Sequence, residues 1–305
     1  MNTDYQQIIN QIAQEVAPLT HQGAVADYIP ALAAVKPGRF AMAVKLADGR
    51  EFTTGEALAP FSIQSISKLL TLTLFIQKQG LELGDRVGVE PSGNPFNSLV
   101  QLEYEGGKPR NPFINAGALV VTDGVMSHYG DAKSLILQTA RKLSSNPALD
   151  YDQAVAASEK QTGFRNAALA NFMKSYGNIL NPVEEVLDTY FHQCSLAMSC
   201  TDLARMFFFL ANEGVDQRGE VVTSPRETKR INALMMTCGT YDAVGDFAFR
   251  VGIPAKSGVG GGIVAVIPRQ MSIAVWSPTL NQQGNSVAGS RALDLFTTYT
   301  RCSVF

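Results

Sequence analysis

The sequence has few residues of the kinds that bind metals or form disulfides. Its 305 residues include three histidines and four cysteines, with no CxxC pair, no HExxH motif and no Cys/His cluster. Zinc sites need such ligands at short spacing, so we expect no metal ion and no cofactor. The scattered cysteines are typical of reduced thiols, and we therefore expect a cytoplasmic protein.

An excess of one charge and long hydrophobic runs are also absent. The net charge is −2, which gives no basic surface for nucleic-acid phosphates or anionic lipids. The longest apolar runs, such as the one around Phe208, are too short to cross a bilayer. Residues 1–19 lack the charged start and unbroken apolar core of a signal peptide. We expect neither nucleic-acid nor membrane partners, and a small-molecule substrate instead.

Strand patterns lie near both ends of the chain and helical patterns fill the middle. An amphipathic helix opens the chain, and residues 39–55 show a strand, an Asp-Gly turn and a second strand. Three β-rich runs follow from Phe247 to Pro278, before a final helix over residues 286–300. The intervening helices are predicted over residues 116–125, 133–143, 165–176, 183–194, 200–212 and 225–237.

This order predicts an α+β fold in which an all-helical domain is inserted into a sheet domain. We expect an antiparallel sheet of about five strands, flanked by N- and C-terminal helices. Residues 1–62 and 245–305 would form the sheet domain, and residues 63–244 the helical domain. Ligands favour the seam between such domains, so the active site is expected there. The Pro-, Gly- and Asn-rich loop over residues 91–117 is long enough to suggest a functional segment.

Several residues are predicted to begin or end helices. Ser62 is a candidate cap for the helix that Gly80 ends, and the SCTD sequence from Ser199 forms a candidate capping box. Pro182 and Pro225 stand where first-turn prolines are found.

Ser65 and Lys68 lie three residues apart at the start of an apolar helix. A serine hydroxyl becomes a good nucleophile when a base takes its proton. A lysine can be that base if its pKa falls by roughly 3 units, and both burial and a helix N-terminus lower it. The alternative is chance, because this spacing occurs about once per chain of average composition.

The sequence AKSGVGGGI over residues 255–263 is a second signal, because it places Lys-Ser-Gly on a predicted strand. Its glycines are expected to let a ligand approach the backbone. The N–H of Val259 can join that of Ser65 as an oxyanion hole. The alternative is a glycine-rich bend between two strands. A phosphate loop is excluded, because GxxxxGK[ST] is absent.

An SxxK helix followed by a distant Lys-Ser-Gly strand resembles the serine β-lactamase and penicillin-binding-protein superfamily. The sequence more closely resembles the serine-dependent glutaminase family, in unbroken order from about residue 24 to 290. The segments that carry this resemblance are ADYIPALA, QSISK, PFNSLVQLE, NPFINAGAL, KSYGN, YFHQCS, INALMMTCG and AKSGVGGGIVAV.

The resemblance implies a β-lactamase-like fold and hydrolysis of L-glutamine to L-glutamate and ammonia through a glutamyl-serine acyl-enzyme. It also implies that the protein is a homo-oligomer, namely a tetramer. Carried over residue by residue, Ser65 is the nucleophile, Lys68 its base and Tyr190 a second proton-transfer group. The N–H groups of Ser65 and Val259 form the oxyanion hole. The residues that would bind the substrate are Tyr28, Gln64, Asn115, Glu159, Asn166, Tyr190, Tyr241 and Val259.

Physical chemistry makes the substrate contacts reasonable. The carboxylate of Glu159 can accept from the α-ammonium of glutamine, and Asn115, Asn166 and Tyr28 can donate to its α-carboxylate.

The residue pattern alone gives simpler roles to several of these positions. Tyr190 falls on the apolar stripe of its helix and reads as a core tyrosine. Glu159 reads as a solvated helix charge, and Asn115 as a helix cap. Tyr176, in the sequence Tyr-Gly-Asn, matches the Tyr-x-Asn element of penicillin-binding relatives and is the alternative to Tyr190.

Two other functions fit the same motifs. A β-lactamase or peptidoglycan peptidase works outside the cytoplasm, yet no export signal and no SDN element is found. Looser Ser-x-Asn triplets at Ser92 and Ser144 lie in turn-like sequence. A non-catalytic ligand-binding module on the same scaffold is disfavoured by the intact Ser65, Lys68 and Lys-Ser-Gly motifs.

Overall fold

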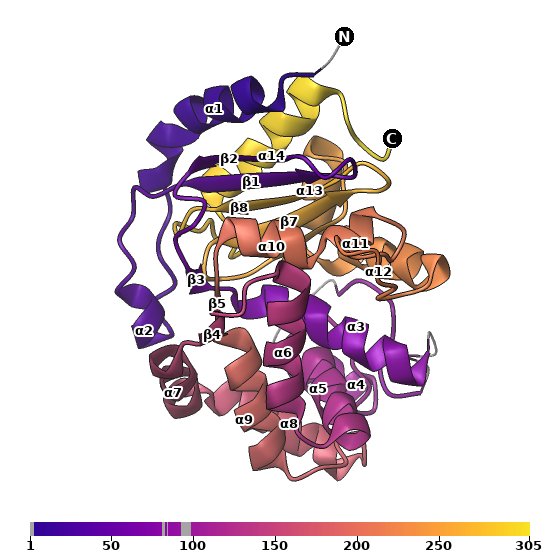
Figure 1. Ribbon diagram of the computed structural model, residues 1–305. Coiled ribbons are helices and arrows are strands. Elements are labelled where there is room, and N and C mark those ends of the chain that lie inside the picture. Colours follow the sequence, from indigo (N-terminus) through magenta and orange to yellow (C-terminus); the bar gives the residue numbers. More distant parts are fainter. Residues whose placement is uncertain (1–2, 81–82, 84, 93–98) are drawn as a thin grey trace.

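The computed structural model describes residues 3–80, 83, 85–92 and 99–305. Figure 1 shows a sheet flanked by helices at the top and a helical region below it, with both termini near the sheet. Part of the PFNSLVQLE segment and most of the triplet from Ser92 lie outside the described residues.

Five antiparallel strands form the main sheet. Their order is β2 (Glu51–Gly55), β1 (Ala41–Leu46), β8 (Met271–Trp276), β7 (Gly262–Ile267) and β6 (Ala255–Ser257). Helices α1 (Tyr5–Val16) and α14 (Val287–Thr300) cover one face, and α10 (Cys200–Met206) and α11 (Phe208–Ala211) cover the other (Figure 1). The structure therefore confirms the predicted α+β fold and its five-stranded sheet.

The central strands are buried on both faces. All six residues of β1 are buried. Met42 and Val44 pack in the cluster that contains α1 and α14, whereas Ala41 and Ala43 pack in the cluster that contains the helical region. Successive side chains of a strand point to opposite faces, so one strand serves two cores. This explains why every residue of the strand except Lys45 is apolar.

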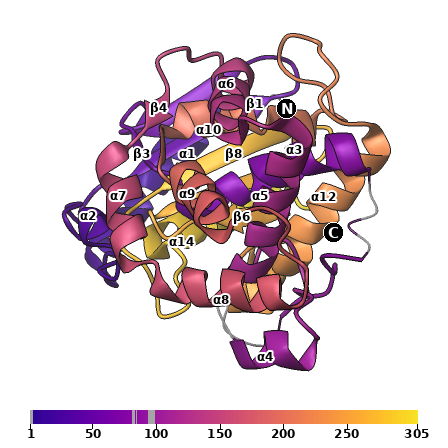
Figure 2. The same ribbon diagram turned by 90° about the horizontal axis from the view of Figure 1, so that it is seen from below.

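The helical region surrounds α3 (Ser67–Gln79), which packs against α5 (Asn115–Tyr129) and α9 (Val183–Cys194), as Figure 2 shows from below. Every residue of α3 from its start to Ile76 is buried, as expected of a helix at the centre of a core. The other helices are α2 (Pro30–Ala33), α4 (Leu99–Tyr104), α6 (Ala132–Ser144), α7 (Gln153–Thr162), α8 (Phe164–Ser175), α12 (Pro225–Cys238) and α13 (Val244–Arg250).

Short elements connect the two regions. Strand β3 (Phe61–Ser62) pairs with β5 (Leu196–Met198), which pairs with β4 (Asp150–Tyr151). Three 3₁₀ helices complete the fold: η1 (Ala17–His21), η2 (Gln64–Ile66) and η3 (Tyr241–Ala243). Helices α10 and α11 belong to residues 63–244 but pack on the sheet. The domain boundaries proposed at residues 62 and 245 therefore remain a prediction.

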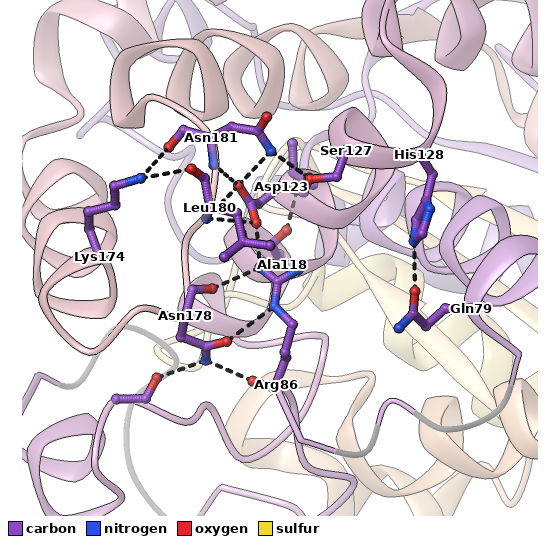
Figure 3. A network of polar contacts seen from close by, with 12 residues as sticks. Gln79, Arg86, Ala118, Asp123, Ser127, His128, Lys174, Asn178, Leu180 and Asn181 are labelled. Carbon is purple, nitrogen blue, oxygen red and sulfur yellow. Dashed lines mark hydrogen bonds and ion pairs between the residues drawn. The ribbon is translucent and has the colours of Figure 1, made fainter.

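A buried carboxylate holds the helical region together (Figure 3). Asp123 of α5 is fully buried and forms an ion pair with Arg86. Its oxygens also accept from the backbone N–H groups of Leu180 and Asn181 at 2.8–3.1 Å. These donors fix the segment after α8 onto α5, which supports the wall of the cavity described below.

The predicted helix ends are confirmed in part. Ser199 and Asp202 form a capping box, Pro225 occupies the first turn of α12, and Gly80 ends α3 at φ +73°. Pro182 instead lies one residue before the first turn of α9.

Ser62 does not cap α3. A 3₁₀ turn precedes that helix, and the Ser62 hydroxyl donates to the Cys194 carbonyl at 2.9 Å.

Two predicted elements differ from the structure. The start of the β-rich run from Phe247 lies in α13, where Phe247 is buried and Phe249 is exposed, whereas the end of the same run forms β6 as predicted. Alternating apolar residues suggested a strand, but a helix of two turns also buries only some of them. The helix predicted over residues 200–212 is broken at Phe207 into α10 and α11. No helix in the described part of the chain is long and apolar enough to cross a membrane.

Candidate active site

Ser65 lies in the 3₁₀ turn η2, where the chain passes from β3 into α3. The glycine-rich segment after β6 packs directly against this turn. A Cβ on Gly260 would lie 2.1 Å from the Ser62 carbonyl oxygen, and one on Gly258 would lie 2.4 Å from that of Ile63. The glycines were predicted to admit a ligand. They also admit the protein's own backbone, which brings Val259 beside Ser65.

A cavity of about 350 Å³ opens above this junction. Eight of the ten predicted site residues line it: Tyr28, Gln64, Ser65, Asn115, Glu159, Asn166, Tyr190 and Val259. Lys68 and Tyr241 are not among the lining residues and are buried. Five further lining residues were not predicted: Ile29, Thr162, Gly163, Arg165 and Cys194.

Lys68 is 1% exposed, in the first turn of α3. Its Nζ donates to the Phe113 carbonyl at 3.1 Å and to Asn115 Oδ1 at 2.7 Å. Burial lowers the pKa of Lys68 from 10.5 to about 8, because a charged amine loses its hydration there. No hydrogen bond between the described side chains joins Lys68 to Ser65.

Tyr241 contacts the candidate nucleophile. Its hydroxyl is hydrogen-bonded to the Ser65 side chain and to the backbone of Val259. It also lies 3.3 Å from the Ser257 carbonyl, to which it donates. Tyr241 itself has φ +59°, a left-handed conformation that is costly for a large side chain. The family resemblance assigned this tyrosine to substrate binding, and the structure places it against Ser65.

Tyr190 lies deeper in the cavity wall. Its hydroxyl is 3.4 Å from Asn115 Oδ1 and is also hydrogen-bonded to the Cys194 thiol. Its ring lies 6.0 Å from the Lys68 Nζ. Tyr176, the alternative to Tyr190, is half-exposed and packs at a tilt against the Phe172 ring, outside the cavity lining.

Glu159 is the acidic group of the cavity. It is 6% exposed, and burial raises its pKa to about 7. The hydrogen bond from Gln64 and the charge of Lys68 lower the pKa, but by less than burial raises it. The Gln64 amide donates to Glu159 Oε1 at 2.9 Å and to the Ser62 hydroxyl at 2.9 Å. Gln64 therefore holds the carboxylate beside the Ser65 turn.

Two amides lie together on the cavity wall. Asn115 Nδ2 donates to Asn166 Oδ1 at 3.0 Å. Tyr28 is 57% exposed at the cavity rim. The cavity thus offers a carboxylate, several neutral donors and a serine hydroxyl, a set that suits an amino acid with a reactive side-chain carbonyl.

Sequence reasoning missed a second buried lysine near the site. Lys256 is fully buried, and its Nζ donates to the carbonyls of Gly239 and Ser257 at 3.1 and 2.6 Å. The amine also lies 4.9 Å from the centre of the Tyr241 ring. Burial holds the pKa of Lys256 well below its ordinary value. The Lys-Ser-Gly motif was the available signal.

The chain matches known proteins over almost its whole length. Residues 23–305 match the family model described as glutaminase. A glutaminase of Streptomyces coelicolor is 56% identical over 303 residues, covering 99% of both chains. A glutaminase of Agrobacterium fabrum is 54% identical over 305 residues, again covering 99% of both.

Solved structures agree with these relatives. A probable glutaminase superposes with a TM-score of 0.93 at 36% identity, covering 98% of this chain and 97% of the other. A probable glutaminase from Bacillus subtilis, complexed with 6-diazo-5-oxo-L-norleucine, gives a TM-score of 0.89 at 30% identity, covering 100% of this chain and 98% of the other. The resemblance found in the sequence is therefore confirmed.

Proposed function

The chain belongs to the glutaminase family, whose members hydrolyse an amide bond, and from this premise we propose that it converts L-glutamine to L-glutamate through a glutamyl ester on Ser65. The surroundings of Ser65 support its role as the nucleophile. Its hydroxyl lines the cavity, is hydrogen-bonded to Tyr241, and lies one helical turn before a buried lysine whose pKa is about 8.

The cavity suits the two charged ends of glutamine. We assign the α-ammonium to Glu159, which Gln64 holds in place at 2.9 Å. The α-carboxylate accepts from the amides of Asn115 and Asn166 and from the Tyr28 hydroxyl. This places the side-chain carboxamide toward Ser65. Glu159 must be ionised to bind the ammonium, and the substrate's charge favours that form.

Acylation begins when Ser65 loses its proton. Neutral Lys68 takes this proton after its flexible side chain turns from Asn115 toward Ser65. Ser65 Oγ attacks the carboxamide carbon, and the oxyanion that forms accepts from the N–H groups of Ser65 and Val259.

A second proton must reach the leaving nitrogen. The geometry favours Tyr241 for this transfer, because its hydroxyl touches Ser65, whereas that of Tyr190 bonds to Asn115 and Cys194. The C–N bond then breaks and ammonia leaves. Water attacks the ester by the reverse proton path, which releases glutamate and restores Ser65.

We further propose a homotetramer that works in the cytoplasm and needs no cofactor. Family resemblance supports the tetramer, and the four free cysteines, three of them buried, support a reducing compartment. Light scattering coupled to size exclusion tests the tetramer, since a monomer or dimer would contradict it.

The test of the function is ammonia release by the purified protein from L-glutamine, with L-asparagine and the Ser65→Ala variant in parallel. Ammonia from glutamine that disappears in the variant supports the proposal. Unchanged turnover by the variant would refute Ser65 as the nucleophile. Absence of turnover with either amide would return the function to the rival β-lactamase or ligand-binding interpretations, which a β-lactam acylation assay separates.

A further inference from the structure

Two of the side chains that line the cavity belong to residue types that are ordinarily charged at neutral pH, one acidic and one basic. Among the described lining residues, Glu159 is the one acid and Arg165 the one base. Glu159 is buried, whereas Arg165 is exposed at the cavity rim. Glu159 lies near the end of α7 and Arg165 in the first turn of α8, so one helix corner supplies both.

Arg165 has no partner among the residues that the structure describes. No described residue forms a hydrogen bond or an ion pair with its guanidinium. The helix does not stabilise it either, because the N-terminus of α8 carries the positive end of the helix dipole. An unpaired cation and a helix N-terminus therefore create positive potential at the rim, with Asn166 as the next residue along the wall.

We propose that Arg165 binds the α-carboxylate of the substrate and makes the cavity selective for the free amino acid. This rests on the proposed function, since it assigns the ammonium of the same molecule to Glu159. A guanidinium can donate two parallel N–H groups to a carboxylate, which neutral amides cannot match in charge. The buried anion and the rim cation complement the two charges of an amino acid zwitterion. A glutamine whose α-carboxyl group is blocked loses the second contact.

The chain provides a matched control in Arg226. It is also exposed, also lacks a described partner, and occupies the same second position of a helix, α12, but it does not line the cavity. Arg226→Gln therefore removes a cation from a helix N-terminus without touching the site. Arg165→Gln removes the candidate contact. Arg165→Lys keeps the positive charge but loses the two parallel N–H groups of the guanidinium.

The experiment measures kcat and KM of the four proteins with L-glutamine and with L-glutaminamide, whose α-carboxyl group is an uncharged amide. Glutaminamide hydrolysis is followed as isoglutamine, so that only side-chain cleavage is counted. Thermal melts establish that the variants fold.

We expect Arg165→Gln to raise KM for glutamine about tenfold and to leave kcat within about twofold, as for loss of one charge-assisted hydrogen bond. Arg165→Lys should fall between it and the parent, and Arg226→Gln should match the parent. Glutaminamide should have a raised KM in the parent, and Arg165→Gln should raise it no further.

An unchanged KM for glutamine in a folded Arg165→Gln variant would overturn the assignment, as would equal losses with both substrates. These outcomes require an active parent, so they leave the proposed function intact. A parent protein that releases no glutamate from glutamine would overturn the proposed function itself, and the Arg165 assignment with it.

Discussion

The buried amine of Lys68 should destabilise the folded protein at neutral pH. Its pKa falls from 10.5 to about 8 on folding, through burial. This fall corresponds to about 3 kcal/mol, since one pH unit is about 1.4 kcal/mol. Between pH 8 and 10.5 the unfolded chain holds a proton that the folded chain has released. Stability therefore rises with pH across that window, and the full cost is present below it.

The assay is urea unfolding of the parent and of Lys68→Met at pH 7 and pH 10. The parent should gain about 2.5 kcal/mol relative to the variant between these two pH values, because most of the window lies between them. Lys78→Met, on the exposed end of the same helix, is the control and should show no comparable pH-dependent difference. If the difference between parent and Lys68→Met is the same at both pH values, the lowered pKa is wrong.

The same group should govern activity. Lys68 accepts a proton only when neutral, so kcat/KM should rise with pH through about 8. Glu159 binds the substrate ammonium only when ionised, so a second rise is expected through about 7. Lys68→Met should lower kcat by about 1000-fold. A flat profile of kcat/KM from pH 6 to 9 would contradict both assignments.

Three further substitutions test other parts of the site. Tyr241→Phe should lower kcat about 100-fold or more, and Tyr190→Phe should lower it less; the reverse order in steady-state assays would restore Tyr190 as the proton-transfer group. Glu159→Gln should raise KM for glutamine between about 10-fold and 100-fold, and an unchanged KM would remove Glu159 from ammonium binding. Gly260→Ala should lower both kcat and the melting temperature, because the new Cβ would lie 2.1 Å from the Ser62 carbonyl oxygen; a fully active, equally stable variant would show that this contact is not needed.

Local sequence patterns predicted the parts of the fold that depend on local interactions. The apolar strand, the Asp-Gly turn and the second strand over residues 39–55 predicted the first hairpin, and the SCTD sequence predicted a capping box that the structure contains. The start of the run from Phe247 was wrongly predicted as a strand, because a short helix and an edge strand can both bury part of an alternating pattern. The prediction that Ser62 caps the helix was wrong because its hydroxyl donates to the carbonyl of Cys194, which is far away in the sequence.

In the candidate site too, the sequence predicted the local arrangement but not the contacts between residues far apart in the chain. The spacing of Ser65 and Lys68 is local, so the sequence placed both residues near the start of α3, although Ser65 lies in the 3₁₀ turn before the helix and only Lys68 lies in its first turn. The contact between Tyr241 and Ser65 joins residues far apart in the chain and depends on a left-handed backbone that no propensity favours. Arg165 passed unnoticed because an exposed arginine is ordinary, and only the cavity makes its position informative.

The central claim is that Ser65 forms a covalent bond with the glutamyl group. The most direct measurement is rapid acid quench of the protein during turnover of L-glutamine, followed by mass spectrometry of the peptide that holds Ser65. The account predicts a glutamyl group on Ser65 that is absent from Ser65→Ala. A glutamyl group on another residue, or the same label in Ser65→Ala, would contradict it.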